Sequence, residues 1–352
     1  MKKIPVGVLG ATGTVGQRFL QLLLDHPWFE VTLVAASDRS AGRTLGEAGR
    51  WLIGGDMPEQ YARMTVRSVD DVGDVPVVFS ALPGDVAGAT EIAWARAGSF
   101  VFSNAGSHRR DPLVPLLVPE VNPDHLDLIP LQRQARGWSG AILTNPNCTT
   151  THAVLPMRPL HDAFGLRKVL LVSMQAISGA GYPGVPSMDI IDNVVPLIGG
   201  EEEKVEWEPL KLLGTLGATG IAEASITISA HCNRVAVIDG HTECLSLAFE
   251  RPPADAEELS AVLRDFRAAP QELRLPSAPA APILVTAAAD GPQPRRDRDA
   301  AKGMATTVGR VRRCPILDYK LVLLGHNTIR GAAGGSLLNA ELAVAQGLIA
   351  KG

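Results

Sequence analysis

Cys148 is the residue of this chain best suited to covalent chemistry. It follows the turn-forming tripeptide Asn145-Pro146-Asn147 and opens an apolar-rich stretch that runs to Phe164. This pattern predicts a helix that begins at the cysteine, where unpaired backbone N–H groups and the helix dipole favour a thiolate. We therefore expect a lowered pKa and a nucleophilic sulfur. The alternative is a buried structural thiol, because free cysteine is among the most buried residue types.

A glycine signature near the start predicts a nucleotide site. A strand is expected over Ile4 to Leu9, then the segment Gly10-Ala-Thr-Gly13-Thr-Val-Gly16, then a helix from Gln17 to Leu24 and a strand from Val31 to Ala36. Glycines let the backbone approach a pyrophosphate at the helix N-terminus, although a packing turn would use the same residues. A nucleophilic cysteine beside a nicotinamide suggests aldehyde–acyl chemistry through a thioester. The candidate cofactor-binding residues here are Gly10, Thr12, Gly13, Thr14 and Val15.

The end of the second strand bears on the choice of cofactor. An acidic residue there would bind the ribose hydroxyls of NAD. The segment contains Ser37, Arg39 and Ser40, which could hold a 2′-phosphate, and arginine suits phosphate recognition. We favour NADP, while Asp38 leaves NAD open.

Composition limits the classes of function. A chain of 352 residues suggests two domains, and a net charge of −4 without a basic block argues against a nucleic-acid partner. No apolar run reaches membrane-spanning length, and the start does not have the pattern of a secretory signal. The four cysteines are spread along the chain, so we expect reduced thiols, a cytoplasmic protein and no metal site.

The order of the expected elements predicts an α/β fold. Further strands over Val75 to Leu82, Phe100 to Ser103 and Ala141 to Thr144 would complete a doubly wound, Rossmann-type parallel sheet. The second half predicts a mostly antiparallel sheet, loops over Ala269 to Arg296, a charged surface stretch over Gly199 to Lys204, and a final helix within Gly331 to Ile349. Its expected strands are Lys168 to Gln175, Ala222 to Ser229, Arg234 to Val237 and Thr242 to Glu250.

Six motifs in order give the chain a specific resemblance. Together they resemble aspartate-semialdehyde dehydrogenase, in particular its archaeal and fungal-type branch. The resemblance implies a catalytic and dimerisation domain of the α+β type over 148–328, with 1–147 plus 329–352 forming the NADP-binding domain. The motifs are Gly10–Gly16, Asn145–Thr150, Gln175–Gly181, Gly200–Glu208, His231–His241 and His326–Ala333.

The resemblance also implies a role for each matching residue. Cys148 would attack the substrate carbonyl, with His241 as general acid/base, Gln175 orienting the substrate and Asn147 supporting the oxyanion. For the substrate, Arg234 would clamp the α-carboxylate and Glu208 would meet the ammonium group, while Arg109 and Lys211 would hold phosphate. Further candidate cofactor-binding residues are Leu82, Pro83, Gly179 and Asn327.

Several alternatives stay open at this point. Arg110 competes with Arg109 for the phosphate, and Glu208 and Lys211, three residues apart, could form a surface ion pair on a helix. In a plain strand Arg234 and His241 would face opposite sides, so they can share a pocket only if a turn intervenes. Asp239-Gly240 supplies a candidate turn.

The resemblance implies a reaction: NADPH-dependent reductive dephosphorylation of L-aspartyl-4-phosphate to L-aspartate 4-semialdehyde, through a thioester on the cysteine. The reverse direction would need inorganic phosphate. The alternatives are malonyl-CoA reductase or another acyl-phosphate or acyl-CoA reductase with the same cysteine chemistry, and a catalytically silent NADP-binding paralogue. The resemblance further implies a homodimer or homotetramer.

Overall fold

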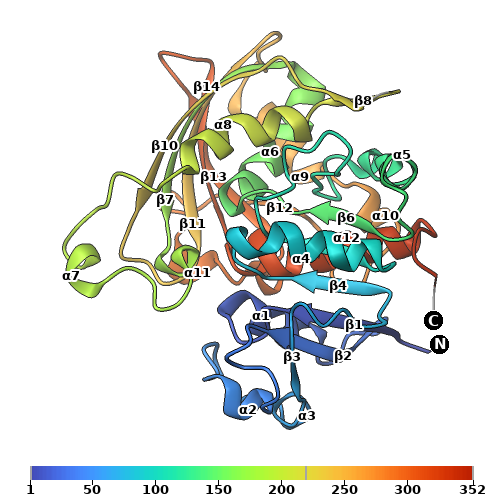
Figure 1. The fold of residues 1–352 in the computed structure, drawn as a ribbon. Helices are drawn as coiled ribbons and strands as arrows, with labels where there is room; N and C mark the ends of the chain where they lie inside the picture. Colours follow the sequence, from blue (N-terminus) through green and yellow to red (C-terminus); the bar gives the residue numbers. More distant parts are fainter. Residues whose placement is uncertain (1, 219, 351–352) are drawn as a thin grey trace.

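The chain forms two large sheets, and the computed structural model describes residues 2–218 and 220–350 (Figure 1). The first sheet has the strand order β3-β2-β1-β4-β5-β6, and its neighbouring strands are parallel. The order reverses at β1, so the predicted doubly wound, Rossmann-type sheet is confirmed. Its strands are β1 (Ile4–Leu9), β2 (Phe29–Ala36), β3 (Val66–Ser68), β4 (Val77–Ser80), β5 (Phe100–Ser103) and β6 (Ala141–Thr144).

Helices cover both faces of this sheet. On one face, α1 (Thr14–Leu23) and α12 (Gly334–Ala345) pack through side chains such as Phe19 and Leu337. On the other face, α4 (Gly84–Arg96) packs through Trp94. Burial on both sides explains why the strands read as short continuous apolar runs. The remaining helices of this half are α2 (Leu45–Ala48), α3 (Glu59–Ala62) and α5 (Leu128–Arg136).

The second sheet is mixed, with the order β10-β7-β11-β14-β13-β12. The three central pairs are antiparallel, but the pairs β10–β7 and β12–β13 at the two edges are parallel. The prediction of a mostly antiparallel sheet is therefore correct only for its centre. The strands are β7 (Leu166–Gln175), β10 (Thr227–Arg234), β11 (His241–Phe249), β12 (Ile283–Val285), β13 (Thr306–Arg313) and β14 (Tyr319–Gly325).

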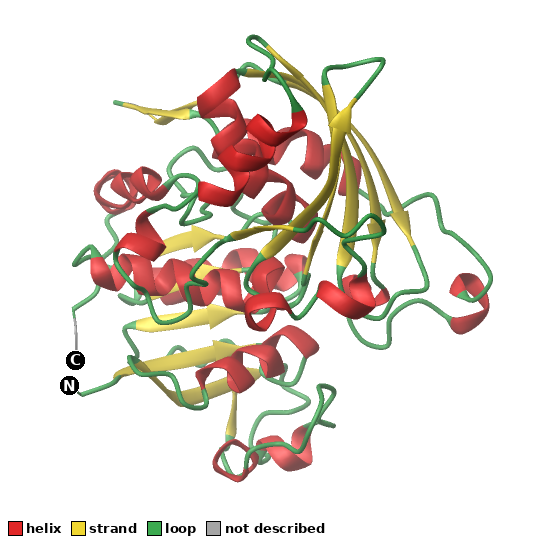
Figure 2. Ribbon diagram, turned by 180° about the vertical axis from the view of Figure 1, so that it is seen from behind, coloured by secondary structure: helices red, strands yellow, loops and turns green. Residues whose placement is uncertain are grey.

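One face of the second sheet carries the hydrophobic core of this half. It packs against α6 (Cys148–Phe164), α8 (Glu201–Leu212) and α9 (Ala256–Asp265). Figure 2 shows the sheet as a curved layer with these helices on its inner side. On the outer face of β7, Leu170 and Val172 remain 47% and 38% exposed. An apolar outer face of this kind is available for contact with another chain.

Several expected elements need correction. The strand expected over Ala222 to Ser229 begins later and continues to Arg234, and the strand expected over Arg234 to Val237 is wrong because the chain leaves the sheet there. Helix α1 begins at Thr14, three residues before the expected start. The charged stretch forms α8, and the segment expected as loops contains short elements. These are α10 (Ala269–Glu272), β12 and α11 (Pro294–Asp297).

Other elements had no prediction at all. Strands β13 and β14 and helix α9 belong to this group, as does the hairpin of β8 (Thr215–Gly217) and β9 (Gly220–Ala222). Helix α7 (Ser187–Ile190) lies on an extended arm after β7 (Figure 1). A π-helical turn (Ile329–Ala333) leads into α12.

Candidate active site

The sulfur of Cys148 lies at the first residue of helix α6, as the sequence predicts. Asn147 caps the helix: its Oδ1 accepts hydrogen bonds from the backbone N–H groups of Thr149 at 2.9 Å and Thr150 at 3.3 Å. The Asn147 amide also donates to Glu201 Oε1 at 2.7 Å. This arrangement holds the cysteine at the N-terminus of the helix, directly after the turn that follows β6.

His241, at the start of β11, is the nearest functional partner of the thiol. Its Nε2 lies 3.2 Å from Cys148 Sγ. On the other side of the ring, Nδ1 accepts a hydrogen bond of 3.0 Å from the backbone N–H of Ala176. Because a backbone N–H can only donate, a neutral ring must carry its proton on Nε2, pointing at the sulfur. His241 is thus arranged to donate a hydrogen bond or a proton to a group at this point.

Burial is the largest cause of the pKa shifts of both His241 and Cys148. It lowers the pKa of His241 well below its ordinary value, and the neighbouring charges of His152 and Arg234 act in the same direction. It also raises the pKa of Cys148 to about 12, and Glu201 adds to the rise, while Arg234, the Thr149 N–H and Arg109 oppose it. The prediction of a lowered cysteine pKa is therefore wrong, because desolvation outweighs the helix terminus. The ring is neutral at pH 7, and removal of the thiol proton is part of any reaction.

Arg234 reaches the same place from the other side of β7. It ends β10, while His241 begins β11, and the two strands flank β7 in the sheet. The connecting segment turns at Gly240, whose φ is +100°, so the predicted turn is present. A Cβ at Gly179 would lie 2.7 Å from Arg234 Nη1 and 3.2 Å from His241 Cε1, which explains the glycine between them. Arg234 Nη1 donates to Ala176 O at 2.8 Å.

Gln175 lies behind these side chains. It ends β7 opposite Arg234 in the parallel register, is 1% exposed, and its amide donates to Ser173 Oγ at 3.2 Å. Its expected role in orienting a substrate stays a prediction, because among the described residues it does not line the cavity below.

A cavity of about 820 Å³ opens between the two halves of the protein in front of Cys148. Its walls join the glycine loop before α1 to the cysteine turn, Arg109 and Arg234. Gly10 has a φ of +78°, and a Cβ at Gly16 would lie 2.1 Å from Gly10 O, so these two glycines serve the tight turn itself. Eight of the candidate cofactor residues line the cavity: Thr12, Gly13, Thr14, Val15, Leu82, Pro83, Gly179 and Asn327.

The residues expected to hold a 2′-phosphate lie apart from this cavity. Ser37, Arg39 and Ser40 follow the end of β2, and among the described residues none of the three belongs to the lining. Asp38 beside them accepts a hydrogen bond of 2.7 Å from the Ser68 hydroxyl of β3. Their role in cofactor selection stays a prediction.

Glu208 and Lys211 are buried in the protein and form no surface ion pair. Glu208 accepts from Arg109 Nη1 at 2.8 Å and from the Asn147 backbone N–H at 2.6 Å. Lys211 donates to the carbonyl oxygens of Arg109, Asp111 and Val114 at 2.8, 2.8 and 3.0 Å. Both side chains are engaged within the protein, and neither is among the described residues that line the cavity. Their expected roles in substrate binding stay predictions.

Glu201 and Lys204, which sequence reasoning assigned to a charged surface, line the cavity instead. Glu201 is 6% exposed, and Lys204 Nζ lies 3.5 Å from its Oε2. The spacing glutamate-x-x-lysine occurs in both pairs of α8. A signal in favour of the first pair was its place at the helix N-terminus, directly after Gly199-Gly200.

The two arginines of the 104–110 loop lie in different surroundings. Arg109 is 8% exposed and lines the cavity, and its Nη2 donates to Asn104 O at 2.9 Å. Arg110 instead stacks its guanidinium over the ring of Trp207, 4.2 Å from the centroid. Of the two, Arg109 is placed to meet an anion in the cavity.

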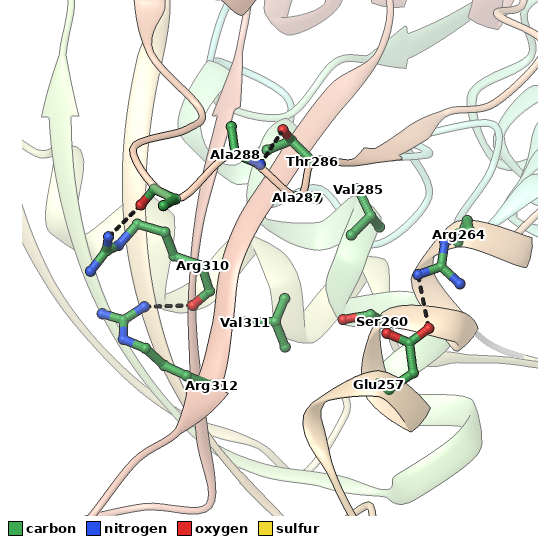
Figure 3. A pocket seen from close by; sticks show the side chains of 11 residues that line it. Glu257, Ser260, Arg264, Val285, Thr286, Ala287, Ala288, Arg310, Val311 and Arg312 are labelled. Atoms are coloured by element: carbon green, nitrogen blue, oxygen red, sulfur yellow. Dashed lines mark hydrogen bonds and ion pairs between the residues drawn. The ribbon is translucent and has the colours of Figure 1, made fainter.

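A second hollow, of about 360 Å³, lies between α9, β12 and β13 (Figure 3). Arg264 pairs with Glu257 at 3.1 Å, and the guanidinium groups of Arg310 and Arg312 donate to backbone carbonyls. The described residues of its lining include neither cysteine nor histidine. The chemistry therefore belongs to the larger cavity.

Comparisons with known proteins agree with this fold and site. A family model for the semialdehyde dehydrogenase NAD binding domain matches residues 5–129, and one for the semialdehyde dehydrogenase dimerisation domain matches residues 157–330. The chain is 51% identical to aspartate-semialdehyde dehydrogenase of Methanothermobacter thermautotrophicus, over 96% of this chain and 98% of that protein. It is 48% identical to the Schizosaccharomyces pombe enzyme, over 98% and 99%.

Solved structures give the same result. The Candida albicans aspartate-semialdehyde dehydrogenase with NADP superposes with a TM-score of 0.91 at 43% identity, covering 99% of this chain and all of that one. The fold and the cysteine–histidine site thus define a semialdehyde dehydrogenase. The chain belongs to the aspartate-semialdehyde dehydrogenase family, as the motifs predict. Within the described residues, the helices are too short or too polar to cross a membrane.

Proposed function

We propose that this protein reduces L-aspartyl-4-phosphate to L-aspartate 4-semialdehyde and phosphate with NADPH, through a thioester on Cys148. The observation that carries the proposal is the pairing of Cys148 Sγ with His241 Nε2 at 3.2 Å on a cavity whose other wall is the glycine loop of a Rossmann-type sheet. Full-length similarity to aspartate-semialdehyde dehydrogenases of archaea and fungi supports it.

The residues present fit a dinucleotide. Gly13 is the N-cap residue of helix α1, and glycine has no side chain to occupy the backbone N–H groups that a pyrophosphate would use. Thr12, Thr14 and Val15 border the same space, and Asn327 and Cys148 also line it. Asn327 is held rigidly: its Oδ1 accepts from Gly240 N–H at 2.9 Å and its Nδ2 donates to Ser178 Oγ at 2.8 Å. When bound, NADPH would supply the hydride.

The protein groups then act in a defined order. The Cys148 thiol loses its proton as the sulfur attacks the β-carbonyl carbon. Phosphate departs with that proton as HPO4²⁻, and an acyl thioester remains on the cysteine. After reduction, the oxygen of the tetrahedral hemithioacetal receives the proton of His241 Nε2, and returns it as the carbon–sulfur bond breaks. The Ala176 N–H keeps the ring in the tautomer that this step requires.

Charged side chains around the cavity match the substrate. Arg234 would clamp the α-carboxylate, and Arg109 would hold the phosphate with Glu208 behind it. We assign the substrate ammonium to Glu201 and a second phosphate contact to Lys204, since these two line the cavity while Glu208 and Lys211 do not. Asn147 places the Glu201 carboxylate beside the cysteine.

The decisive assay is reduction of NADP by the purified protein with L-aspartate 4-semialdehyde, with and without inorganic phosphate. We expect NADPH to form only with phosphate, and Cys148→Ala to abolish turnover while NADP binding is retained. Retained turnover in Cys148→Ala would refute the thioester route. Phosphate-independent activity with coenzyme A instead would point to an acyl-CoA reductase.

We also propose a cytoplasmic homo-oligomer, assembled through the second domain over 148–328. The support is apolar surface: Leu170 and Val172 on β7, and Met188 and Leu197 on the arm that follows it, 87% and 71% exposed. The dimerisation-domain match covers the same region. Light scattering would separate a dimer from a tetramer, and a monomer at micromolar concentration would refute the proposal.

A further inference from the structure

A buried carboxyl group lies beneath the loop that carries Arg109. Glu91, on α4, has no exposed surface. Its Oε1 accepts a hydrogen bond of 2.7 Å from the hydroxyl of Ser103, the last residue of β5. Its Oε2 lies 3.5 Å from Nε2 of His108, the residue before Arg109, and among the described residues neither of these two buried atoms has a hydrogen-bond partner. One carboxyl group therefore contacts both ends of the loop.

The rest of the loop depends on the same contacts. The Ser103 Oγ that donates to Glu91 also accepts from the backbone N–H of Ala105 at 3.1 Å. Arg109 closes the loop on itself by donating to Asn104 O at 2.9 Å. These contacts connect Glu91 to the loop that carries Arg109, although Glu91 itself is not among the described residues that line the cavity.

The Glu91 carboxyl group changes its protonation state near neutral pH. Burial raises the pKa of Glu91 to about 7, against the hydroxyls of Ser80 and Ser103 and the charge of Arg109. Burial also lowers the pKa of His108, with Asp111 and Arg136 acting on it in opposite directions. Ser80 comes from β4 and Ser103 from β5, while the packed strand β6, of sequence Ala-Ile-Leu-Thr, has no titratable side chain.

We propose that Glu91 is a positioning residue for phosphate: by accepting a hydrogen bond from Ser103 and lying against His108, it determines where Arg109 meets the anion. Deprotonated Glu91 adds a negative charge behind that arginine, so phosphate binding weakens as pH rises through neutrality. The inference rests on the proposed function, in which Arg109 is the phosphate ligand.

The test compares the phosphate KM of wild type, Glu91→Gln and Glu91→Ala between pH 6 and 8.5, with the full-length protein and the phosphate-dependent NADP assay. Glutamine can still accept from Ser103 but does not ionise. Alanine removes both contacts. Because inorganic phosphate ionises equally in every sample, the ratio of wild-type to variant KM reports the protein alone. Arg96→Gln, an exposed charge at the far end of α4, is the matched control.

We expect the phosphate KM of wild type and Glu91→Gln to agree at pH 6, and the wild-type value to be about three- to tenfold higher at pH 8.5, the effect of one nearby unit charge. Glu91→Ala should raise the phosphate KM about tenfold at every pH, because the loop is no longer held. The semialdehyde KM should stay within about twofold in both variants, since other residues contact that substrate.

Parallel changes in the KM of both substrates, or a wild-type to Glu91→Gln ratio that does not vary with pH, would overturn the inference while leaving the proposed function standing. Glu91→Gln alone decides the result if Glu91→Ala does not fold. A wild-type protein without phosphate-dependent activity would overturn both.

Discussion

Replacing Lys211 by methionine should destabilise the protein without acting directly on substrate binding. Lys211 is 4% exposed, and its ammonium group donates to three carbonyl groups of residues 109–114 at 2.8 to 3.0 Å. A hydrogen bond from a charged group contributes about 1.5–3 kcal/mol, and the three are not additive because they share one donor group. We expect a loss of about 3–5 kcal/mol in the free energy of unfolding.

The matched control is Lys204→Met on the same helix. That side chain is 43% exposed and its only described ion pair, with Glu201, spans 3.5 Å. An exposed pair of this kind contributes at most about 1 kcal/mol, so the variant should unfold nearly like wild type while its phosphate KM rises.

Urea unfolding, followed by tryptophan fluorescence and circular dichroism, measures both variants at 25 °C. A Lys211→Met protein within about 1 kcal/mol of Lys204→Met would refute the reasoning, because buried carbonyls left without a donor must destabilise the fold. A stable Lys211→Met enzyme with a raised phosphate KM would restore Lys211 as a phosphate ligand.

Two further changes test the site. Arg234→Lys keeps the charge but loses the planar fork, and kcat/KM for the semialdehyde should fall by the equivalent of about 1–3 kcal/mol; unchanged kinetics would remove Arg234 as the carboxylate clamp. Glu243 on β11 is fully buried, and burial, with Glu201 adding, raises its pKa well above the ordinary value. The folded state then keeps a proton that the unfolded state releases above about pH 4.3, so folding stability falls as pH rises. Glu243→Gln should therefore gain stability over wild type from pH 5 to pH 8 in urea unfolding, and a constant difference would contradict the shift.

Much of the first domain was predictable because its signals are local. Strands β1, β5 and β6 have the bounds expected from short apolar runs that end at glycine, asparagine or serine. The position of Cys148 at a helix start follows from the turn residues before it. The second sheet was harder to predict, since β10 and β7 are parallel neighbours whose paired residues are 59 positions apart, and nothing in either segment specifies that pairing.

The sequence by itself determined which chemical groups the protein has, the order of its motifs and its family. Only the tertiary structure decided which of two glutamate–lysine pairs on α8 faces the cavity, and which of two arginines does. It also determined the pKa of Cys148, because burial and the charge of Glu201 raise it by more than the helix terminus lowers it. The physical reason is that desolvation and hydrogen bonding depend on neighbours from distant segments: Glu208 meets Asn147 across 61 positions, and Cys148 meets His241 across 93.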